Sequence, residues 1–226
     1  MMGEFGSVYV TLKLAFASTF GLMVIAVPLA WWLANTRNRI KPVIEALTTL
    51  PLVLPPTVFG FYLLILFSPE FPIGSFWVRV TGETLAFSFA GILMATVLHS
   101  LPFVVQPLQN AFESVGKGAL EAAATLGARP LDAFRSVAVP LARRGFLTAA
   151  VLGFAHSVGE FGVILMVGGN IPDRTRVISI DIYTSVETLD YAKAHILSAG
   201  TLVFSFIALL SLYIINRGWR GRVQGL

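Results

Sequence analysis

Cysteine, histidine and charge are all scarce in this chain. None of the 226 residues is cysteine, which excludes a disulfide framework, a thiolate metal site and a cysteine nucleophile. Histidine occurs only at His99, His156 and His195, and because these positions are far apart in the sequence we expect no metal site. Charged residues make up 12% of the chain, against about 25% in soluble domains, and they fall between long apolar runs. This pattern predicts an all-α, polytopic membrane protein.

Five apolar segments reach the roughly 20 residues that a membrane-spanning helix needs. They cover residues 8–34, 43–67, 87–108, 146–169 and 196–216. The segment 177–196 predicts a further short helix, either interfacial or re-entrant, so we expect five to six helices in a single domain over residues 1–226. The first segment lacks a basic leader and is longer than the apolar part of a signal peptide, so we expect an uncleaved first span.

Basic residues collect on one side of the predicted spans. Three clusters fall on the same side: Arg37, Arg39 and Lys41; Lys117, Arg129, Arg135, Arg143 and Arg144; and Arg217, Arg220 and Arg222. Since cytoplasmic loops carry an excess of lysine and arginine, we predict a multi-pass protein of the plasma (cell inner) membrane, with its N-terminus outside and its C-terminus in the cytoplasm. This arrangement accounts for the net charge of +4, so we expect membrane lipid and not nucleic acid as a partner.

Prolines interrupt the second and third predicted spans. Pro51, Pro55 and Pro56 lie in the second, and Pro102 and Pro107 lie in the third. Each proline removes a backbone hydrogen bond and favours a kink, and a carbonyl freed at membrane depth needs protein or water beside it. Two interpretations stay open: the kinks shape helix packing, or the kinked helices line a pathway.

A charged segment rich in small residues lies on the predicted cytoplasmic side, at about residues 114–144. We expect a short helix over residues 120–126 that ends at Gly127, because glycine commonly terminates helices. Pro130 suits the first turn of a second helix. The segment therefore predicts two short helices joined at an angle.

The second of these helices carries an apolar stripe formed by Leu131, Phe134 and Ala138. An apolar face in an aqueous compartment indicates a protein partner. From composition alone, a loop folded back on the membrane surface remains the alternative.

Ten positions of this segment resemble the EAA loop of ABC-importer permeases. They are Glu121, Ala122, Ala123, Leu126, Gly127, Ala128, Phe134, Val137, Pro140 and Gly145. In that family two coupling helices dock into a groove of a cytoplasmic ATPase subunit and transmit closure of its nucleotide dimer. The resemblance implies a type I ABC-importer permease fold, with ATP and Mg²⁺ bound by the partner and no cofactor on this chain. The sequence shows no glycine-rich phosphate-binding loop, so we expect no enzyme activity of its own.

Two further stretches resemble molybdate permeases. Residues 47–67 are similar to the second span of that family, and residues 156–183 are similar to its fourth span and the following loop. Sulfate permeases share part of the second pattern. The resemblance implies a homodimer with its pathway on the two-fold axis, two ATPase subunits and an extracytoplasmic oxyanion-binding protein. The expected function is ATP-driven import of molybdate, with tungstate as a related substrate.

Three other functions stay open. A sulfate or thiosulfate permease would usually pair two different permease chains, so a homodimer favours molybdate. An ATP-independent channel or secondary transporter would need an inverted repeat or intramembrane carboxylates for ion coupling, and neither is clear in the sequence. A membrane scaffold without transport fits poorly with spans that prolines interrupt.

Polar side chains within the spans are the candidates for a pathway or gate: Thr57, Ser100, His156, Ser157 and Glu160. Hydroxyl groups can hold a dianion, because neutral donors suffice, although hydroxyls in membrane helices commonly bond their own backbone. Glu160 would repel molybdate. We therefore expect Glu160 to cap a broken helix, to pair with His156 four residues earlier, or to hold a gate closed.

The external loop at residues 168–177 carries Arg174 and Arg176. These side chains are candidates for docking the binding protein or for meeting the anion at the entrance. An ordinary solvated turn is the alternative.

Overall fold

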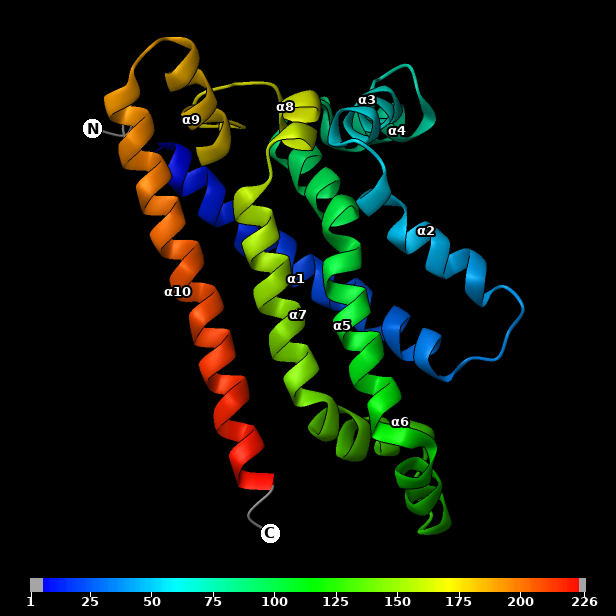
Figure 1. Cartoon of the computed structure of the whole chain (residues 1–226). Coiled ribbons are helices and arrows are strands. Elements are labelled where there is room, and N and C mark those ends of the chain that lie inside the picture. The colour runs from blue at the N-terminus through cyan, green and yellow to red at the C-terminus, as the bar shows by residue number, and fades with distance from the viewer. Residues whose placement is uncertain (1–5, 224–226) are drawn as a thin grey trace.

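The regular elements are all helical in the computed structural model, which describes residues 6–223 and the side chains up to residue 216. In chain order they are α1 (Gly6–Asn35), α2 (Lys41–Val53), α3 (Pro56–Phe67), α4 (Pro72–Thr81), α5 (Phe89–Thr125), α6 (Pro130–Ala133), the π-helical turn η1 (Phe134–Ala138), α7 (Val139–Gly159), α8 (Gly162–Gly168), α9 (Ile178–Glu187) and α10 (Tyr191–Val223). The helices α5, α7 and α10 run along the long axis, while α3, α4, α8 and α9 gather at one end (Figure 1). The predicted all-α class is confirmed.

Four helical stretches are long and apolar enough to cross a membrane, and one bent pair brings the number up to five. They are α1, α5, the run Pro130–Gly159 and α10 as far as Asn216, with α2 and α3 as the bent pair. The expected short helix in residues 177–196 is present as α9, which has 10 residues. At 1.5 Å per residue it extends about 15 Å and is too short to span.

The second predicted span, residues 43–67, is two helices rather than one. The axes of α2 and α3 differ by 112°. Leu54 and Pro55 between them have extended backbone angles, with ψ of 136° and 133°. Pro55 and Pro56 lack the amide donors that a continuous helix needs, and a residue before proline is disfavoured in the helical region. The prolines that predicted a kink therefore produce a sharp break.

The fourth predicted span, residues 146–169, was wrong as a single helix. The helix α7 ends at Gly159, and α8 begins only at Gly162. Between them Glu160 is extended, with ψ of 132°, and Phe161 has φ of −129° and ψ of −65°. Glu160 is the one Asp, Glu, Lys or Arg within this mainly apolar run, and hydropathy averaged over the run does not reveal the break.

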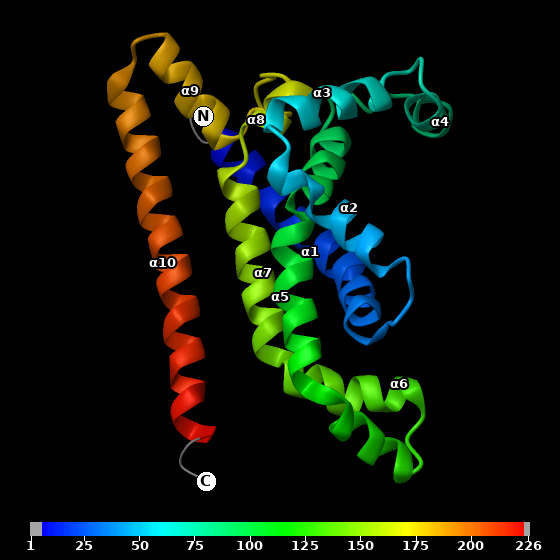
Figure 2. The ribbon, with the colours of Figure 1, turned by 45° about the vertical axis from the view of Figure 1, so that its right-hand side comes forward.

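The helix α5 continues through Pro102 and Pro107 but changes direction at Gly116. Gly116 has φ of 72° and ψ of 158°, a region of backbone space that is accessible almost only to glycine. The helix is not interrupted at the two prolines, and its one residue with non-helical backbone angles is Gly116. Residues 117–125 consequently form a separate short helix that turns away from the span (Figure 2).

The largest of three buried apolar clusters in the described residues lies where α1, α5 and α7 pack together with η1. Its buried members are Leu22, Ala26, Ala30, Leu33, Val104, Val105, Leu108, Phe112, Ala138, Ala142 and Ala149. A Cβ added at Gly145 would stand 2.1 Å from the Cβ of Ala111, so α5 and α7 approach closely only because this residue is glycine.

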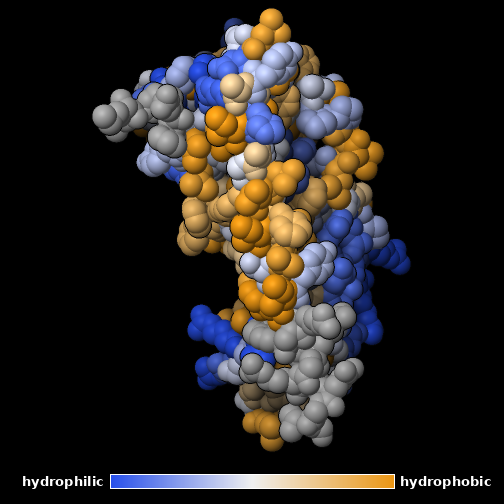
Figure 3. Space-filling model, turned by 60° about the vertical axis from the view of Figure 1, so that its left-hand side comes forward, coloured by the Kyte–Doolittle hydropathy of each residue, from blue (hydrophilic) through white to orange (hydrophobic). Residues whose placement is uncertain are grey.

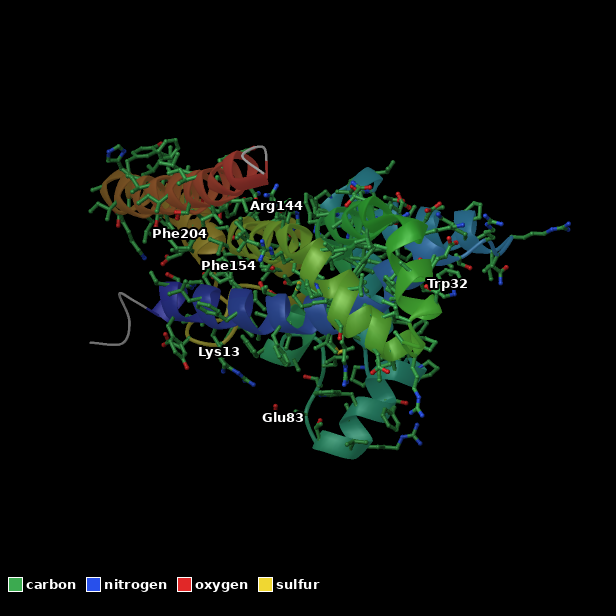
Figure 4. All side chains as sticks on the ribbon, turned by 90° about the horizontal axis from the view of Figure 1, so that it is seen from below. Lys13, Trp32, Glu83, Arg144, Phe154 and Phe204 are labelled. Carbon is green, nitrogen blue, oxygen red and sulfur yellow. The ribbon has the colours of Figure 1, made fainter. Side chains whose placement is uncertain are left out.

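The helix α10 packs only lightly on the rest of the chain. Only 6% of its apolar window is buried, and on the face where it comes forward hydrophobic side chains fill the middle of the surface (Figure 3). Phe204 of α10 meets Phe154 of α7 with ring centroids 6.1 Å apart (Figure 4). An apolar face of this kind suits lipid or a second protein chain.

The two ends of the molecule carry different elements. The start of α1 lies with α4, α8 and α9, whereas α6 and the end of α10 lie at the opposite end (Figure 1). The segment 114–144 and the end of α10 therefore share one end, as the loop charges predict. The side chains of the predicted cluster Arg217, Arg220 and Arg222 lie outside the described residues.

Candidate functional site

We call the segment at about residues 114–144 the coupling loop. Its first short helix ends in a turn at Gly127. Gly127 has φ of 84°. Its amide donates to the carbonyl of Ala124 and the amide of Ala128 donates to that of Ala123, both at 3.0 Å. This pair of bonds is a Schellman motif, which satisfies the last carbonyls of a helix and favours glycine at this position. The predicted stop at Gly127 is confirmed.

The second short helix begins at Pro130, as predicted, with Arg129 as its extended N-cap residue. It passes through η1 into α7 without a gap, so the loop is joined rigidly to a membrane span. Phe134 in η1 packs edge-on against Trp31 of α1 with ring centroids 5.0 Å apart, and its ring centroid lies 6.0 Å from that of Phe112 of α5. The loop is therefore fastened to two further helices by aromatic contacts.

The predicted apolar stripe does not face outward as a whole. Ala138 is fully buried and Phe134 packs against the core, so only Leu131 of the three is exposed, at 56%. The amphipathic pattern was interpreted as a docking face, but most of it covers the chain's own core. The outward apolar surface instead combines Leu131 with Leu126, which is 89% exposed at the turn between the helices.

The other positions that resemble the EAA loop differ in their exposure to solvent. Glu121, Ala122 and Gly127 are exposed, and Ala123 and Ala128 are partly buried. Pro140 is exposed in the first turn of α7. The loop thus exposes two carboxylates, Glu121 and Asp132, together with small side chains and the leucines Leu126 and Leu131.

A second group of predicted residues meets inside the molecule at the break between α7 and α8. Ser100 Oγ on α5 lies 2.9 Å from His156 Nδ1 on α7. Glu160 Oε2 lies 3.8 Å from the same nitrogen and only 2.8 Å from Nδ1 of His99 on α5. His99 and His156 have ring centroids 5.3 Å apart. We call His99, Ser100, His156 and Glu160 the buried polar cluster.

Glu160 also fixes the start of α8. Its Oε1 accepts the amide of Val163 at 3.3 Å, and its backbone carbonyl accepts Ser179 Oγ at 2.5 Å. The carboxylate therefore caps a broken helix and contacts both histidines, so two of its expected roles are present together. Sequence reasoning missed His99, because the contact joins residues in different spans and no local pattern marks it.

Two other predicted pathway residues lie apart from this cluster. Ser157 is buried, accepts Ser18 Oγ of α1 at 2.9 Å, and donates to the carbonyl of Gly153 at 2.8 Å. It therefore bonds its own helix and a neighbour, which is the ordinary behaviour of such hydroxyls. Thr57 is exposed in the first turn of α3.

The predicted docking arginines lie in the connection from α8 to α9. Arg176 Nε donates to Asn170 Oδ1 at 2.5 Å, within the same loop. Arg174 lines a pocket of about 390 Å³ with Lys13, Glu83 and Asp173. Opposite charges thus face this pocket at the end of the molecule that carries the start of α1.

Asp181 of α9 connects three helices near this end. It accepts hydrogen bonds from Ser7 of α1 and Lys193 of α10, both at 2.7 Å. Burial on its own would raise the pKa of Asp181, but the bonds from Lys193 and Ser7 outweigh burial and hold the pKa below its ordinary value. The sequence assigned this residue no role.

A polar groove of about 1110 Å³ lies between α5, α7 and α10. Its polar lining residues are Gln106, Asn110, Arg144, Thr148, Tyr213 and Asn216. Arg144 lies beside α10 when the molecule is seen from below (Figure 4). Asn216 Nδ2 donates to Thr148 Oγ1 at 3.4 Å, while Asn216 Oδ1 has no hydrogen-bond partner among the described residues. The groove supplies one cation and several neutral donors, which suit an oxyanion.

Comparison with known proteins gives consistent results. The family described as "Binding-protein-dependent transport system inner membrane component" matches residues 26–221. The molybdenum transport system permease protein ModB of Azotobacter vinelandii is 54% identical over 214 residues, covering 95% of each chain. The sulfate transport system permease protein CysT of Salmonella typhimurium is 33% identical, covering 96% of this chain and 78% of that protein. A solved structure of the MetNI methionine ABC transporter has the same fold, with a TM-score of 0.73, 20% identity and 94% coverage of both chains.

Proposed function

Since the chain belongs to the family of binding-protein-dependent transport system inner membrane components, we propose that it is the permease subunit of an ATP-driven importer of molybdate. The observation that supports molybdate as the substrate is the 54% sequence identity, over 95% of both chains, to a molybdenum permease. Identity to a sulfate permease is only 33%. Tungstate, a tetrahedral dianion like molybdate, is a second substrate of the same site. Sulfate or thiosulfate import is the alternative that the lower identity disfavours.

In such an importer the pathway, the ATPase and the anion-binding protein are separate subunits, and this defines the partners of the chain. Two copies of this chain enclose the pathway, and the apolar, lightly packed face of α10 is available to lipid or the second copy. ATP and Mg²⁺ bind to separate cytoplasmic ATPase subunits, and a binding protein outside delivers the anion. The chain itself performs no covalent chemistry. The N-terminus lies outside the cell inner membrane and the C-terminus lies in the cytoplasm.

Movement of the ATPase is coupled to the membrane helices through the turn at Gly127. The exposed side chains of Glu121, Leu126 and Leu131 contact the ATPase, while Phe134 transmits its movement to α1 and α5 through ring contacts. Because Pro130–Gly159 is helical throughout, displacement of the turn shifts the break at Glu160 at the far end of the same helical run. Closure of the ATPase dimer would in this way reach the end of the span where α3 and α8 lie.

The anion is passed rather than tightly held. Arg144, Gln106 and Asn110 offer it a cation and amide donors in the groove, and Thr57, Ser100 and Ser157 remain candidates along the route. Arg174 and Arg176 are positioned at the opposite end to meet the binding protein or the arriving anion. A cage of several cations would retain a dianion instead of releasing it.

Substrate identity is tested in vesicles that contain this chain and its ATPase. Binding protein loaded with molybdate, tungstate or sulfate is added on the outside, and ATP turnover and anion uptake are measured. We expect molybdate and tungstate to stimulate both activities and sulfate to stimulate neither. Stimulation by sulfate alone would replace the proposal with the sulfate alternative, and uptake without ATP would exclude an ATP-driven importer.

Docking is tested by a matched pair of leucine substitutions. Leu126→Ser removes an exposed apolar contact from the coupling turn, and Leu189→Ser removes a similarly exposed leucine, 71% accessible, at the other end of the molecule. We expect ATPase co-purification to fall at least about tenfold for Leu126→Ser, which corresponds to about 1.4 kcal/mol, and to be unchanged for Leu189→Ser. Equal retention of the ATPase by both variants would contradict docking at the turn.

A further inference from the structure

The buried polar cluster contains the donor set of a transition-metal site. His99, His156 and Glu160 each place one ligand atom within 4.8 Å of the other two. The measured separations of Glu160 Oε2 from the two Nδ1 atoms are 2.8 Å and 3.8 Å. Zinc binds imidazole nitrogen and carboxylate oxygen at about 2.0–2.2 Å, so shifts of about 1 Å bring all three atoms to bonding distance of one ion.

One ligand atom lacks the hydrogen bond that would otherwise explain its position. His99 is only 8% exposed, and its Nδ1 has no hydrogen-bond partner among the described residues. The Glu160 Oε2 atom lies 2.8 Å from this nitrogen, and the two groups form an ion pair when the imidazole is protonated. Two buried ligand atoms this close together need a positive charge between them, and a divalent metal ion can supply it.

The charge of the site also calls for a cation. Glu160 is 5% exposed, and within the described residues its ion pairs are with His99 and His156 alone. A buried carboxylate is costly unless a positive charge compensates it. A divalent ion compensates the carboxylate without requiring either imidazole to carry a proton.

The surrounding side chains hold the histidine rings in place. The Phe103 ring stacks on His156 with centroids 3.9 Å apart, and Phe59 of α3 lies 5.5 Å from His99. Fixed ring orientation favours metal binding, because ligands that are already positioned lose little freedom. Ser100, whose Oγ bonds His156 Nδ1, would turn to another acceptor when the metal binds.

We propose that His99, His156 and Glu160 bind one zinc-class divalent ion, which clamps α5 to the break between α7 and α8. Two imidazoles and one carboxylate select zinc and its neighbours over magnesium and calcium, which prefer oxygen ligands alone. Three protein ligands leave a fourth position for water. The site is separate from the coupling turn and does not depend on which anion is transported.

The test is zinc binding to the full chain in detergent, purified without a polyhistidine tag. We expect about one Zn²⁺ per chain, undisturbed by excess Mg²⁺, with affinity reduced at least about tenfold in His99→Ala, His156→Ala and Glu160→Gln. The matched control is His195→Ala, which removes the third histidine, exposed on α10, and should bind zinc as the wild type does. Absence of stoichiometric zinc, or loss of binding in His195→Ala instead, would overturn the proposal.

A measurement on the wild type keeps the test decisive if the variants do not fold. X-ray absorption of the zinc-loaded chain should show two imidazole ligands together with oxygen. A spectrum with oxygen ligands alone, or with a single imidazole, would refute the site. Neither experiment uses transport or ATP turnover, so its failure would leave the proposed function unaffected.

Discussion

At the scale of single residues, Gly145 is a position where the packing leaves no room for a side chain. Its added Cβ would stand 2.1 Å from the Cβ of Ala111 and 3.1 Å from the carbonyl oxygen of Pro107. We expect Gly145→Ala to destabilise the protein by about 1–3 kcal/mol through overpacking, seen as a lower thermal midpoint in detergent. The control is Gly200→Ala in α10, where nothing lies within 4 Å. Unchanged midpoints in both variants would show that α5 and α7 do not pack as described.

The structural roles of some of these residues could be predicted from neighbouring sequence, and the roles of others could not. Gly127 and Pro130 were placed correctly, because glycine at a helix end and proline in a first turn act through their own backbone. His99 was missed. The expectation of no metal site stays untested, but its premise fails, because His99 and His156 lie together with Glu160. Distance in sequence between His99 and His156 says nothing about distance in space once two helices pack side by side.

At the scale of elements, Gly116 sets the direction in which the coupling helix leaves the membrane. Its φ of 72° and ψ of 158° would strain any other residue, at a cost of about 1–3 kcal/mol. We expect Gly116→Ala to straighten or loosen the break, so that ATP turnover stimulated by the loaded binding protein falls while the purified chain stays folded. Gly118→Ala, two residues further where a Cβ meets open space, should keep full stimulation. A normal response from Gly116→Ala would mean that the break plays no part in coupling.

The junction of α1, α9 and α10 at Asp181 should make stability depend on pH. Because bonds from Lys193 and Ser7 hold the pKa of Asp181 below its ordinary value, the folded state favours the ionised form. The stabilisation is fully present above the ordinary aspartate pKa of about 3.9 and is lost as pH falls through the lower pKa of the folded state. The difference in thermal midpoint between wild type and Asp181→Asn should therefore be constant near neutral pH and shrink at acidic pH. A difference that grows on acidification would contradict this assignment.

Element boundaries show why hydropathy alone could not deliver the fold. Residues 43–67 and residues 146–169 are both mainly apolar, and both are broken in the structure. Pro55 and Pro56 predict the first break, because proline lacks the backbone N–H that a continuous helix needs as a donor. The second break is marked in the sequence only by the charged residue Glu160. Its carboxylate contacts His99 of α5 and accepts the nearby amide of Val163, and these contacts set where the helix is interrupted. The apolar stripe of Leu131, Phe134 and Ala138 is a similar case. The sequence shows which side of the helix is apolar, but it does not show that the core of the same chain covers most of that side.

At the scale of the whole molecule, the absence of cysteine makes the membrane orientation directly measurable. Glu83 is exposed in the connection from α4 to α5 (Figure 4), and Lys117 is exposed just after the break in α5. If basic loops face the cytoplasm, a membrane-impermeant maleimide should label Glu83→Cys in intact spheroplasts and Lys117→Cys only after permeabilisation. The wild type, which has no cysteine, gives the background. The reverse labelling pattern would place the coupling turn outside the cell, where no cytoplasmic ATPase could bind it.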